Sequence, residues 1–197
     1  MKGIILHGGH GTRLRPLTHT GPKQLLPIAN KPMSQYCIES ICDAGITDIA
    51  IIIGGLGANK VREYYGNGEK FGVNITYVEQ DEPRGIAHAI RLCKEFVNNE
   101  KFLVFLGDNI IQKPITNFVE SFTKSDYDAT VLFKPSLKFV FFFQPKSLEI
   151  LVEFILYLRS WPGLSSTSSI RSCGLFIISN IFFTSVKLSI SLLAEML

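Results

Sequence analysis

One stretch near the start of the chain decides the fold, and it reads GIILHGGHGTRLRP from Gly3 to Pro16. Its first four residues form a short apolar run that is typical of a buried strand. Three glycines follow closely (Gly8, Gly9 and Gly11), and a backbone without Cβ atoms can turn sharply there and lie against a ligand. A strand that leads into such a loop indicates an α/β protein, because ligands of parallel sheets lie at the carboxyl ends of the strands.

The alternation of strand and helix continues up to about Phe133. Strands that are apolar on both faces and separated by helices indicate the α/β class, with a mostly parallel sheet flanked by helices. The expected strands are Gly3 to Leu6, Ile49 to Ile53, Ile75 to Val78, Phe102 to Leu106 and Ala129 to Phe133. The expected helices are Met33 to Ala44 (with Gly45 as its C-cap), Ile86 to Phe96 and Ile115 to Phe122.

Composition narrows the class of protein and its surroundings. The chain has 197 residues, of which 46% are hydrophobic and 19% charged, which suits one packed domain. A net charge of +3 without a basic stripe gives no reason to expect nucleic acid as a partner. The uncharged stretch 172–186 is shorter than the ~20 apolar residues of a spanning helix, so no membrane segment is expected. Four cysteines without a CxxC pair favour reduced thiols and a cytoplasmic location.

The character of the chain changes after roughly Lys138. Charged residues number 7 in the last 59 positions against 30 in the first 138, and no aspartate follows Asp128. We therefore divide the chain into residues 1–135 and residues 136–197, a deviant remainder of the same domain. Two explanations of the remainder stay open: a divergent segment with another purpose, or a truncated or frame-shifted gene.

The glycine loop itself has the chemistry of an anion site. Successive backbone N–H groups there can form a concave site for phosphate, and Arg13 and Arg15 add positive charge. A P-loop is excluded because no Gly-Lys dipeptide occurs, and the dinucleotide pattern GxGxxG fails because Leu14 occupies its last position. From the loop alone, phosphate binding and a plain structural turn remain equally open.

Longer motifs follow the loop. They read PKQLLPI from Pro22 to Ile28, NKPM from Asn30 to Met33, VEQDEPRGIAHA from Val78 to Ala89, and LGDN from Leu106 to Asn109. Together with GGxGTRLxPxT these motifs resemble the sugar-phosphate nucleotidyltransferases, most closely the glucose-1-phosphate thymidylyltransferases. The resemblance covers residues 1 to about 133, and it implies that residues 1–135 are the nucleotide-binding part of a nucleotidyltransferase domain.

The resemblance implies a fold and a reaction. The fold would be the Rossmann-like fold of nucleotide-diphospho-sugar transferases. The reaction would join dTTP to glucose 1-phosphate, giving dTDP-glucose and pyrophosphate with Mg²⁺ as cofactor. The string from Gly85 to Ala89 favours the thymidylyl enzymes, while UTP and an N-acetylglucosamine phosphate remain open as substrates. Homo-oligomerisation is also left open.

The resemblance also implies roles for particular residues. Arg13 and Lys23 would contact the phosphates and help pyrophosphate leave, because transfer at phosphorus depends on positioning and charge stabilisation. Asp108 would hold the metal and ribose, and a carboxylate at a strand's carboxyl end suits Mg²⁺. Gln80 would bind the base, and Gly85 would let the backbone approach it. The implied nucleotide-binding set is Gly8, Gly9, Gly11, Thr12, Arg13, Gln80, Gly85 and Asp108.

For some residues the sequence leaves more than one role open. Helix capping is a competing role at the end of the Phe102 to Leu106 strand, and Asn109 is the better candidate for it than Asp108. His7 stands where the family usually has alanine, and we expect it to crowd the base or ribose. The other histidines, His88 included, are expected to be solvated or structural.

The sugar-binding half that the resemblance requires is not recognisable. No Glu-Lys-Pro motif, GELEITD-like segment or second metal-binding aspartate occurs after Asp128. The alternative function is therefore a nucleotide-binding remnant that binds without turnover.

Overall fold

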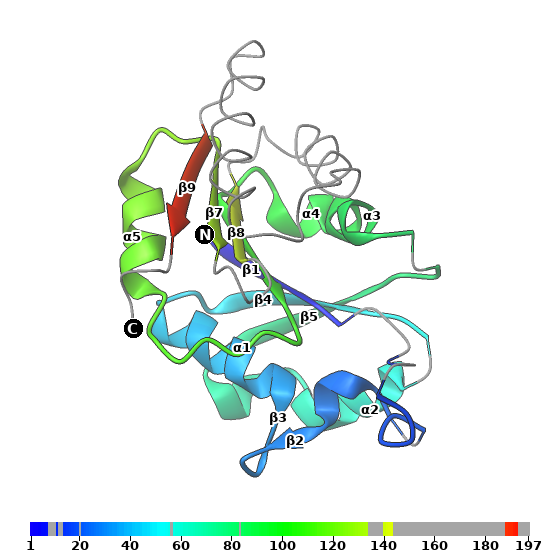
Figure 1. Ribbon diagram of the computed structural model, residues 1–197. Coiled ribbons are helices and arrows are strands. Elements are labelled where there is room, and N and C mark those ends of the chain that lie inside the picture. Colours follow the sequence, from blue (N-terminus) through cyan, green and yellow to red (C-terminus); the bar gives the residue numbers. More distant parts are fainter. Residues whose placement is uncertain are drawn as a thin grey trace, which may run out of the picture.

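The structure is a computed structural model, and it describes residues 1–7, 11, 14–19, 21–55, 57–82, 84–133, 140–143 and 188–192. Its centre is a seven-stranded sheet in the order β5-β4-β1-β6-β8-β7-β9 (Figure 1). All neighbouring pairs are parallel except those of β8, which runs antiparallel to β6 and β7. The strands are β1 (Lys2–Leu6), β4 (Asp48–Ile53), β5 (Asn74–Glu79), β6 (Phe102–Leu106), β7 (Ala129–Phe133), β8 (Val140–Phe143) and β9 (Leu188–Leu192). The prediction of a mostly parallel α/β sheet is confirmed.

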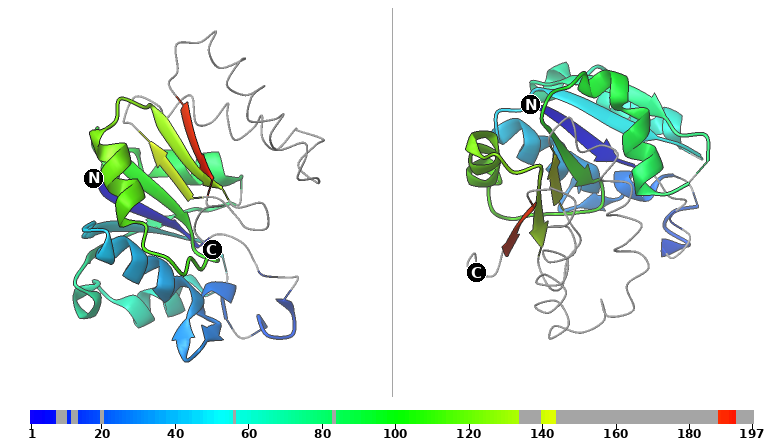
Figure 2. Two further views of the ribbon diagram at one scale, coloured as in Figure 1. Left: turned by 60° about the vertical axis from the view of Figure 1, so that its left-hand side comes forward. Right: turned by 90° about the horizontal axis from the view of Figure 1, so that it is seen from above.

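Helices cover both faces of this sheet (Figure 2). They are α1 (Met33–Asp43), α2 (Ala58–Tyr65), α3 (Ile86–Leu92), α4 (Lys94–Val97) and α5 (Thr116–Lys124). Alternate residues of the strands enter two separate cores: Ile5, Ile51 and Phe105 pack with α1, α2 and α5, whereas Ile4 and Ile52 pack with α3 and α4. Strands buried on both faces explain the continuous apolar runs in the sequence.

The predicted helices need three corrections. The expected helix from Ile86 to Phe96 is divided at Cys93 into α3 and α4. The helix expected from Ile115 lies one residue later and extends to Lys124. Asn109 caps no helix, because the residues between it and Thr116 are not helical, so that alternative is wrong. Gly45 does end α1 with a φ of 78°, as predicted.

The order of the strands creates a switch point between β1 and β6. From β1 the chain moves through β4 to β5 on one side, then crosses by α3 and α4 to β6 on the other side of β1. In open α/β sheets, the crevice outside the carboxyl ends of the strands at such a point is where ligands bind. The glycine loop follows β1 and Asp108 follows β6, so the fold brings both motifs to this point.

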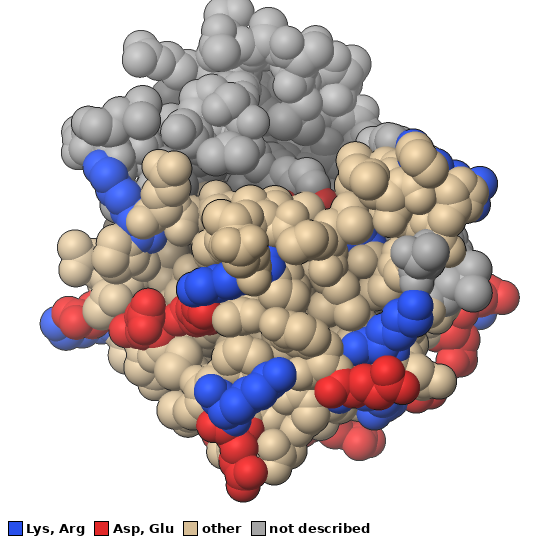
Figure 3. All heavy atoms as spheres, turned by 90° about the horizontal axis from the view of Figure 1, so that it is seen from below, with Lys and Arg blue, Asp and Glu red and all other residues tan. Residues whose placement is uncertain are grey.

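The surface seen from below carries charges of both signs. Lys and Arg side chains lie beside Asp and Glu side chains on this face (Figure 3). Two of the ion pairs in the described part are Lys31–Glu39 and Arg62–Glu79, with N–O distances of 2.9 and 2.7 Å. Among the described helices, none combines the length and apolar character that crossing a membrane requires.

Gly57 is required where α2 meets the segment before Lys23. It precedes α2 with a φ of 94°, and a Cβ there would lie 2.5 Å from Pro22 Cδ. Gly45 has a similar φ of 78° but no atom within 4 Å of its Cβ position. Both positions therefore require a residue that tolerates a positive φ, but only at Gly57 would a Cβ also clash with a neighbouring atom.

We expect Gly57→Ala to destabilise the protein more than Gly45→Ala. Both substitutions force alanine into the left-handed region, at about 1 kcal/mol each. Gly57→Ala also overpacks against Pro22, which adds roughly 1–3 kcal/mol. Urea unfolding followed by circular dichroism measures the difference. Equal losses for the two variants would show that Pro22 does not lie against α2 as described.

Candidate functional site

Lys23 and Asp108 form an ion pair at the switch point. The distance from Lys23 Nζ to Asp108 Oδ2 is 2.7 Å, although the residues are 85 positions apart in the sequence. Their side chains are 23% and 14% exposed, so the pair is mostly shielded but still reachable from solvent. The structure thus brings together two residues that the sequence analysis selected from separate motifs.

Asp108 comes directly after the end of β6. Gly107, which precedes it, donates its backbone N–H to Leu6 O at 3.0 Å and so ties the turn to the end of β1. A Cβ on Gly107 would lie 2.8 Å from Leu6 O and 2.7 Å from His7 Cδ2. Only glycine fits this close approach, which fixes where the carboxylate of Asp108 leaves the sheet.

Lys23 begins a short 3-10 helix, η2 (Lys23–Leu25), that is held by the end of the glycine loop. Gly11 has a φ of 61°, and a Cβ there would lie 3.3 Å from Lys23 Cβ and 2.9 Å from Thr18 Cγ2. Thr18 Oγ1 donates to Gly11 O at 2.8 Å. Gly11 therefore lies against Lys23, as a shared phosphate site would require. Gly8, Gly9, Thr12 and Arg13 lie outside the described residues, and their roles stay predictions.

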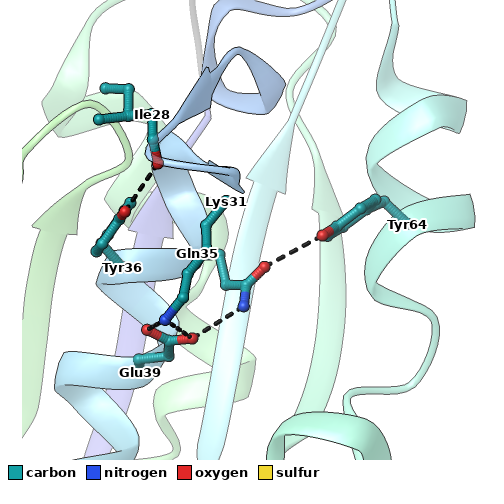
Figure 4. Close-up of polar contacts among 6 residues, drawn as sticks. All are labelled: Ile28, Lys31, Gln35, Tyr36, Glu39 and Tyr64. Carbon is teal, nitrogen blue, oxygen red and sulfur yellow. Dashed lines mark hydrogen bonds and ion pairs between the residues drawn. The ribbon is translucent and has the colours of Figure 1, made fainter.

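The segment after η2 is anchored to α1 and α2 (Figure 4). It forms a hairpin of β2 (Pro27–Ile28) and β3 (Lys31–Pro32). Lys31 Nζ contacts both carboxylate oxygens of Glu39 at 3.0 and 2.9 Å, and Tyr36 donates to Ile28 O at 2.8 Å. Gln35 links Glu39 to Tyr64 of α2 by bonds of 2.9 and 3.1 Å. These contacts fix the chain on the carboxyl-terminal side of Lys23.

Gln80 lies at the other end of the same edge, directly after β5. Its side chain is only 8% exposed, and Nε2 donates to His88 Nδ1 at 3.1 Å and to Gly85 O at 3.5 Å. Since an amide nitrogen can only donate, His88 must carry its proton on Nε2. Gly85 has a φ of 103°, which glycine tolerates.

The site therefore has two separated parts along one edge of the sheet. Three strand spacings separate β5 from β6, and at ~4.8 Å each they place Gln80 and Asp108 about 14 Å apart. A base at Gln80 and phosphates at Lys23 would follow this edge. Among the described residues no three His, Cys, Asp or Glu side chains are grouped to hold a metal ion.

The sequence analysis missed the part that His88 plays. His88 lies on α3 and orients the Gln80 amide through this hydrogen bond. This is a more specific structural role than the sequence analysis expected. The signal available in the sequence was its position three residues after Gly85, at the start of a helix that follows a strand. That spacing alone could not reveal the contact, because it depends on where β5 ends.

His7 is buried beside the ion pair. It is 4% exposed, lies edge-on to Tyr65 with 6.2 Å between ring centroids, and neither ring nitrogen has a hydrogen-bond partner among the described residues. Burial, and then the charge of Lys23, lower the pKa of His7 to about 3. His7 thus lies against Tyr65 of α2, and its expected crowding of the base or ribose stays a prediction.

The strand order, with the site at the carboxyl-terminal edge of the sheet, defines the class of protein: a doubly wound α/β protein with Rossmann-like topology. Within that class the chain belongs to the nucleotidyl transferase family, whose model, described as "Nucleotidyl transferase", matches residues 2–138. The match ends where the charged character of the sequence also ends. The sequence-based identification of the family is confirmed.

Relatives and a solved structure agree with that assignment. Low-salt glycan biosynthesis nucleotidyltransferase Agl11 of Haloferax volcanii is 47% identical over 131 residues, 66% of this chain and 37% of the relative. Glucose-1-phosphate thymidylyltransferase of Streptomyces antibioticus is 47% identical over 122 residues, 62% of this chain and 34% of the relative. The chain thus spans little more than a third of the length of these curated relatives. A Bacillus anthracis structure described as a glucose-1-phosphate thymidylyltransferase in complex with a sucrose is 30% identical, with a TM-score of 0.76 over 98% of this chain and 86% of that one.

We expect the buried imidazole of His7 to make the protein less stable in mild acid. Between the ordinary pKa of 6.5 and the folded value of about 3, the unfolded chain takes up a proton that the folded chain does not. Stability contributed by neutral His7 is complete above pH 6.5 and is lost as pH falls, by up to ~1.4 kcal/mol per pH unit.

The measurement is urea unfolding at several pH values between 7 and 4 for the wild type, His7→Ala and, as a control, His19→Ala, whose side chain is exposed. The stability of His7→Ala should fall less steeply with acid than that of the other two proteins. Parallel profiles for all three would mean that His7 is not buried as a neutral group.

Proposed function

We propose that this chain is the nucleotide-binding part of a sugar-1-phosphate nucleotidyltransferase that uses dTTP and glucose 1-phosphate. The observation that carries the proposal is the Lys23–Asp108 pair, with Nζ 2.7 Å from Oδ2, at the switch point beside Gly11. A cation for phosphate and a carboxylate for metal are thereby in contact at the place where an α/β sheet binds its ligand.

In the proposed reaction, a phosphate oxygen of the sugar phosphate attacks the α-phosphorus of the triphosphate. The bond from that phosphorus to the bridging oxygen of the β-phosphate breaks, and pyrophosphate leaves with the electron pair. Negative charge accumulates on the transferred and leaving groups, and catalysis consists mainly of positioning and charge stabilisation. Lys23 would neutralise this charge, together with Arg13, which lies outside the described residues.

The residues present suit Mg²⁺. This ion usually takes one or two protein carboxylates, waters and substrate phosphates rather than an all-protein cage. Asp108 offers one partly exposed carboxylate at the strand end, with cationic Lys23 next to it to contact the same phosphates. When bound, the ion would draw charge from the phosphate oxygens and help align the triphosphate.

The choice of dTTP rests on Gln80, on the GIAHA string and on the thymidylyltransferase relative. The Gln80 amide is held by His88 and Gly85, so its carbonyl oxygen and its nitrogen have a fixed orientation. Because both protons of Nε2 are engaged in these contacts, the carbonyl oxygen is the group left for the base, and it can accept from the imide N–H of a pyrimidine. Because another relative is named for glycan biosynthesis, the experiment below also includes other nucleoside triphosphates and other sugar phosphates.

A second candidate is binding without turnover. The absence of aspartate and of a Glu-Lys-Pro motif from residues 129–197 favours it. A panel of triphosphates is titrated with and without Mg²⁺, and glucose 1-phosphate is then added while pyrophosphate is followed. Turnover supports the transferase, and tight binding without pyrophosphate supports the second candidate.

The ion pair predicts opposite effects for its two members. Asp108→Asn removes the carboxylate that occupies Lys23 and repels phosphate, so dTTP affinity without Mg²⁺ should rise while the gain from Mg²⁺ disappears. Lys23→Ala removes the cation and keeps the negative charge of Asp108 near the phosphates, so affinity should fall in both conditions. The loss for Lys23→Ala is about 10–100-fold, as for a hydrogen bond to a charged group.

Isothermal titration calorimetry measures these affinities. Lys124→Ala is the control, because Lys124 also pairs with a carboxylate, that of Glu120, but lies exposed on α5. If Asp108→Asn and Lys23→Ala change the affinity without Mg²⁺ in the same direction, or if neither differs from Lys124→Ala, the proposed phosphate and metal roles are wrong.

A further inference from the structure

Helix α1 presents two small polar side chains to the segments that carry the ion pair. Ser34 and Cys37 are three residues apart, so they lie on the same face of the helix, and both are fully buried. One of them contacts the backbone next to Lys23, and the other contacts the backbone on both sides of Asp108. No part of the proposed function so far uses either residue.

Ser34 acts on the Lys23 side. Its Oγ donates to Gln24 O at 3.1 Å, and the hydroxyl of Tyr65 lies 2.7 Å from the same Oγ. Because a serine hydroxyl has a single proton, Tyr65 must be the donor in the second contact. Burial raises the pKa of Tyr65, which keeps that proton in place. The result is a chain of two hydrogen bonds from α2 through α1 to the carbonyl of Gln24, the residue after Lys23.

Cys37 acts on the Asp108 side. Its Sγ lies 3.2 Å from Asn109 O and 3.6 Å from Leu106 O. Burial first, and the charge of Asp108 second, raise the pKa of Cys37, so the thiol keeps its proton and donates. The thiol has a single proton, which the nearer Asn109 carbonyl accepts, while Leu106 O on the other side of Asp108 lies in contact with the same sulfur. Cys37 therefore restrains the turn that aims the carboxylate.

We propose that Ser34 and Cys37 are positioning residues for nucleotidyl transfer, because one face of α1 holds the Lys23 and Asp108 segments in register. The inference rests on the proposed function. A rigid helix that contacts both segments can set the distance between the cation and the carboxylate. Displacement of a reacting or binding group by 1 Å can lower the rate ~100-fold. The effect of Cys37 on function can therefore be much larger than the contribution of its weak thiol hydrogen bond to folding stability.

Cys93 offers a matched control for Cys37. Both thiols are fully buried, so replacement of either by alanine removes the same atoms from a core. Cys93 packs with Ile90 and Val97 on the opposite face of the sheet, between α3 and α4. Any effect common to the two alanine variants is therefore loss of packing, and an effect on binding that is confined to Cys37→Ala is positional.

The experiment uses the full chain with Cys37→Ala, Cys37→Ser, Cys93→Ala and Ser34→Ala. Calorimetry gives dTTP affinity with and without Mg²⁺, and urea unfolding gives stability. Cys37→Ala should lose ~10-fold or more of the gain in affinity that Mg²⁺ brings, whereas Cys37→Ser, which keeps a donor, and Cys93→Ala should retain it. Ser34→Ala should weaken metal-free binding and leave the gain from Mg²⁺ unchanged.

Contrary outcomes are distinct from one another. If Cys37→Ala and Cys93→Ala bind alike, or if Cys37→Ser loses as much as Cys37→Ala, the positioning role is overturned while the proposed function stands. If Cys37→Ala does not fold, Ser34→Ala provides the test. An unchanged affinity for dTTP without Mg²⁺ in that variant then overturns the positioning role. If the wild type itself shows no magnesium-dependent affinity for any triphosphate, the proposed function fails, and the inference fails with it.

Discussion

The contact between Lys23 and Asp108 is the constraint on which the rest of the structure depends. It joins two segments 85 residues apart, and it exists only because β1 and β6 are neighbours in register. Partly buried opposite charges stabilise each other, and loss of one partner would leave the other poorly solvated. The glycines on either side serve this contact: Gly11 lets the loop lie against Lys23, and Gly107 lets the Asp108 turn approach β1.

The same contact explains how binding and structure are linked. In the free protein each charge satisfies the other, so a phosphate chain and a metal ion must replace both partners together. A ligand that supplies only one of them separates the two charges without replacing both contacts, which costs free energy in a shielded place. On the proposed function, this geometry would favour a metal–nucleotide complex over either component alone.

Much of this fold was predictable from the sequence. The continuous apolar runs around Ile5, Ile51 and Phe105 predicted the strands, because strands buried on both faces need continuous apolar residues. Helix α2 was missed, since only Val61 and Tyr65 of its residues are buried and its apolar pattern is short. Lys23 and Asp108 were selected through family motifs, but their contact was not foreseen. The contacts of Ser34 and Cys37 depend on packing between distant segments, and that of His88 depends on where β5 ends. No local pattern in a single sequence reveals either.

The most direct test of the account is a crystal structure of the chain with Mg²⁺ and dTTP. The account predicts that Lys23 Nζ leaves Asp108 and contacts a phosphate oxygen, that Asp108 coordinates the metal, and that the thymine lies at Gln80 and Gly85. A nucleotide bound elsewhere on the molecule, with Nζ still 2.7 Å from Oδ2, would contradict it.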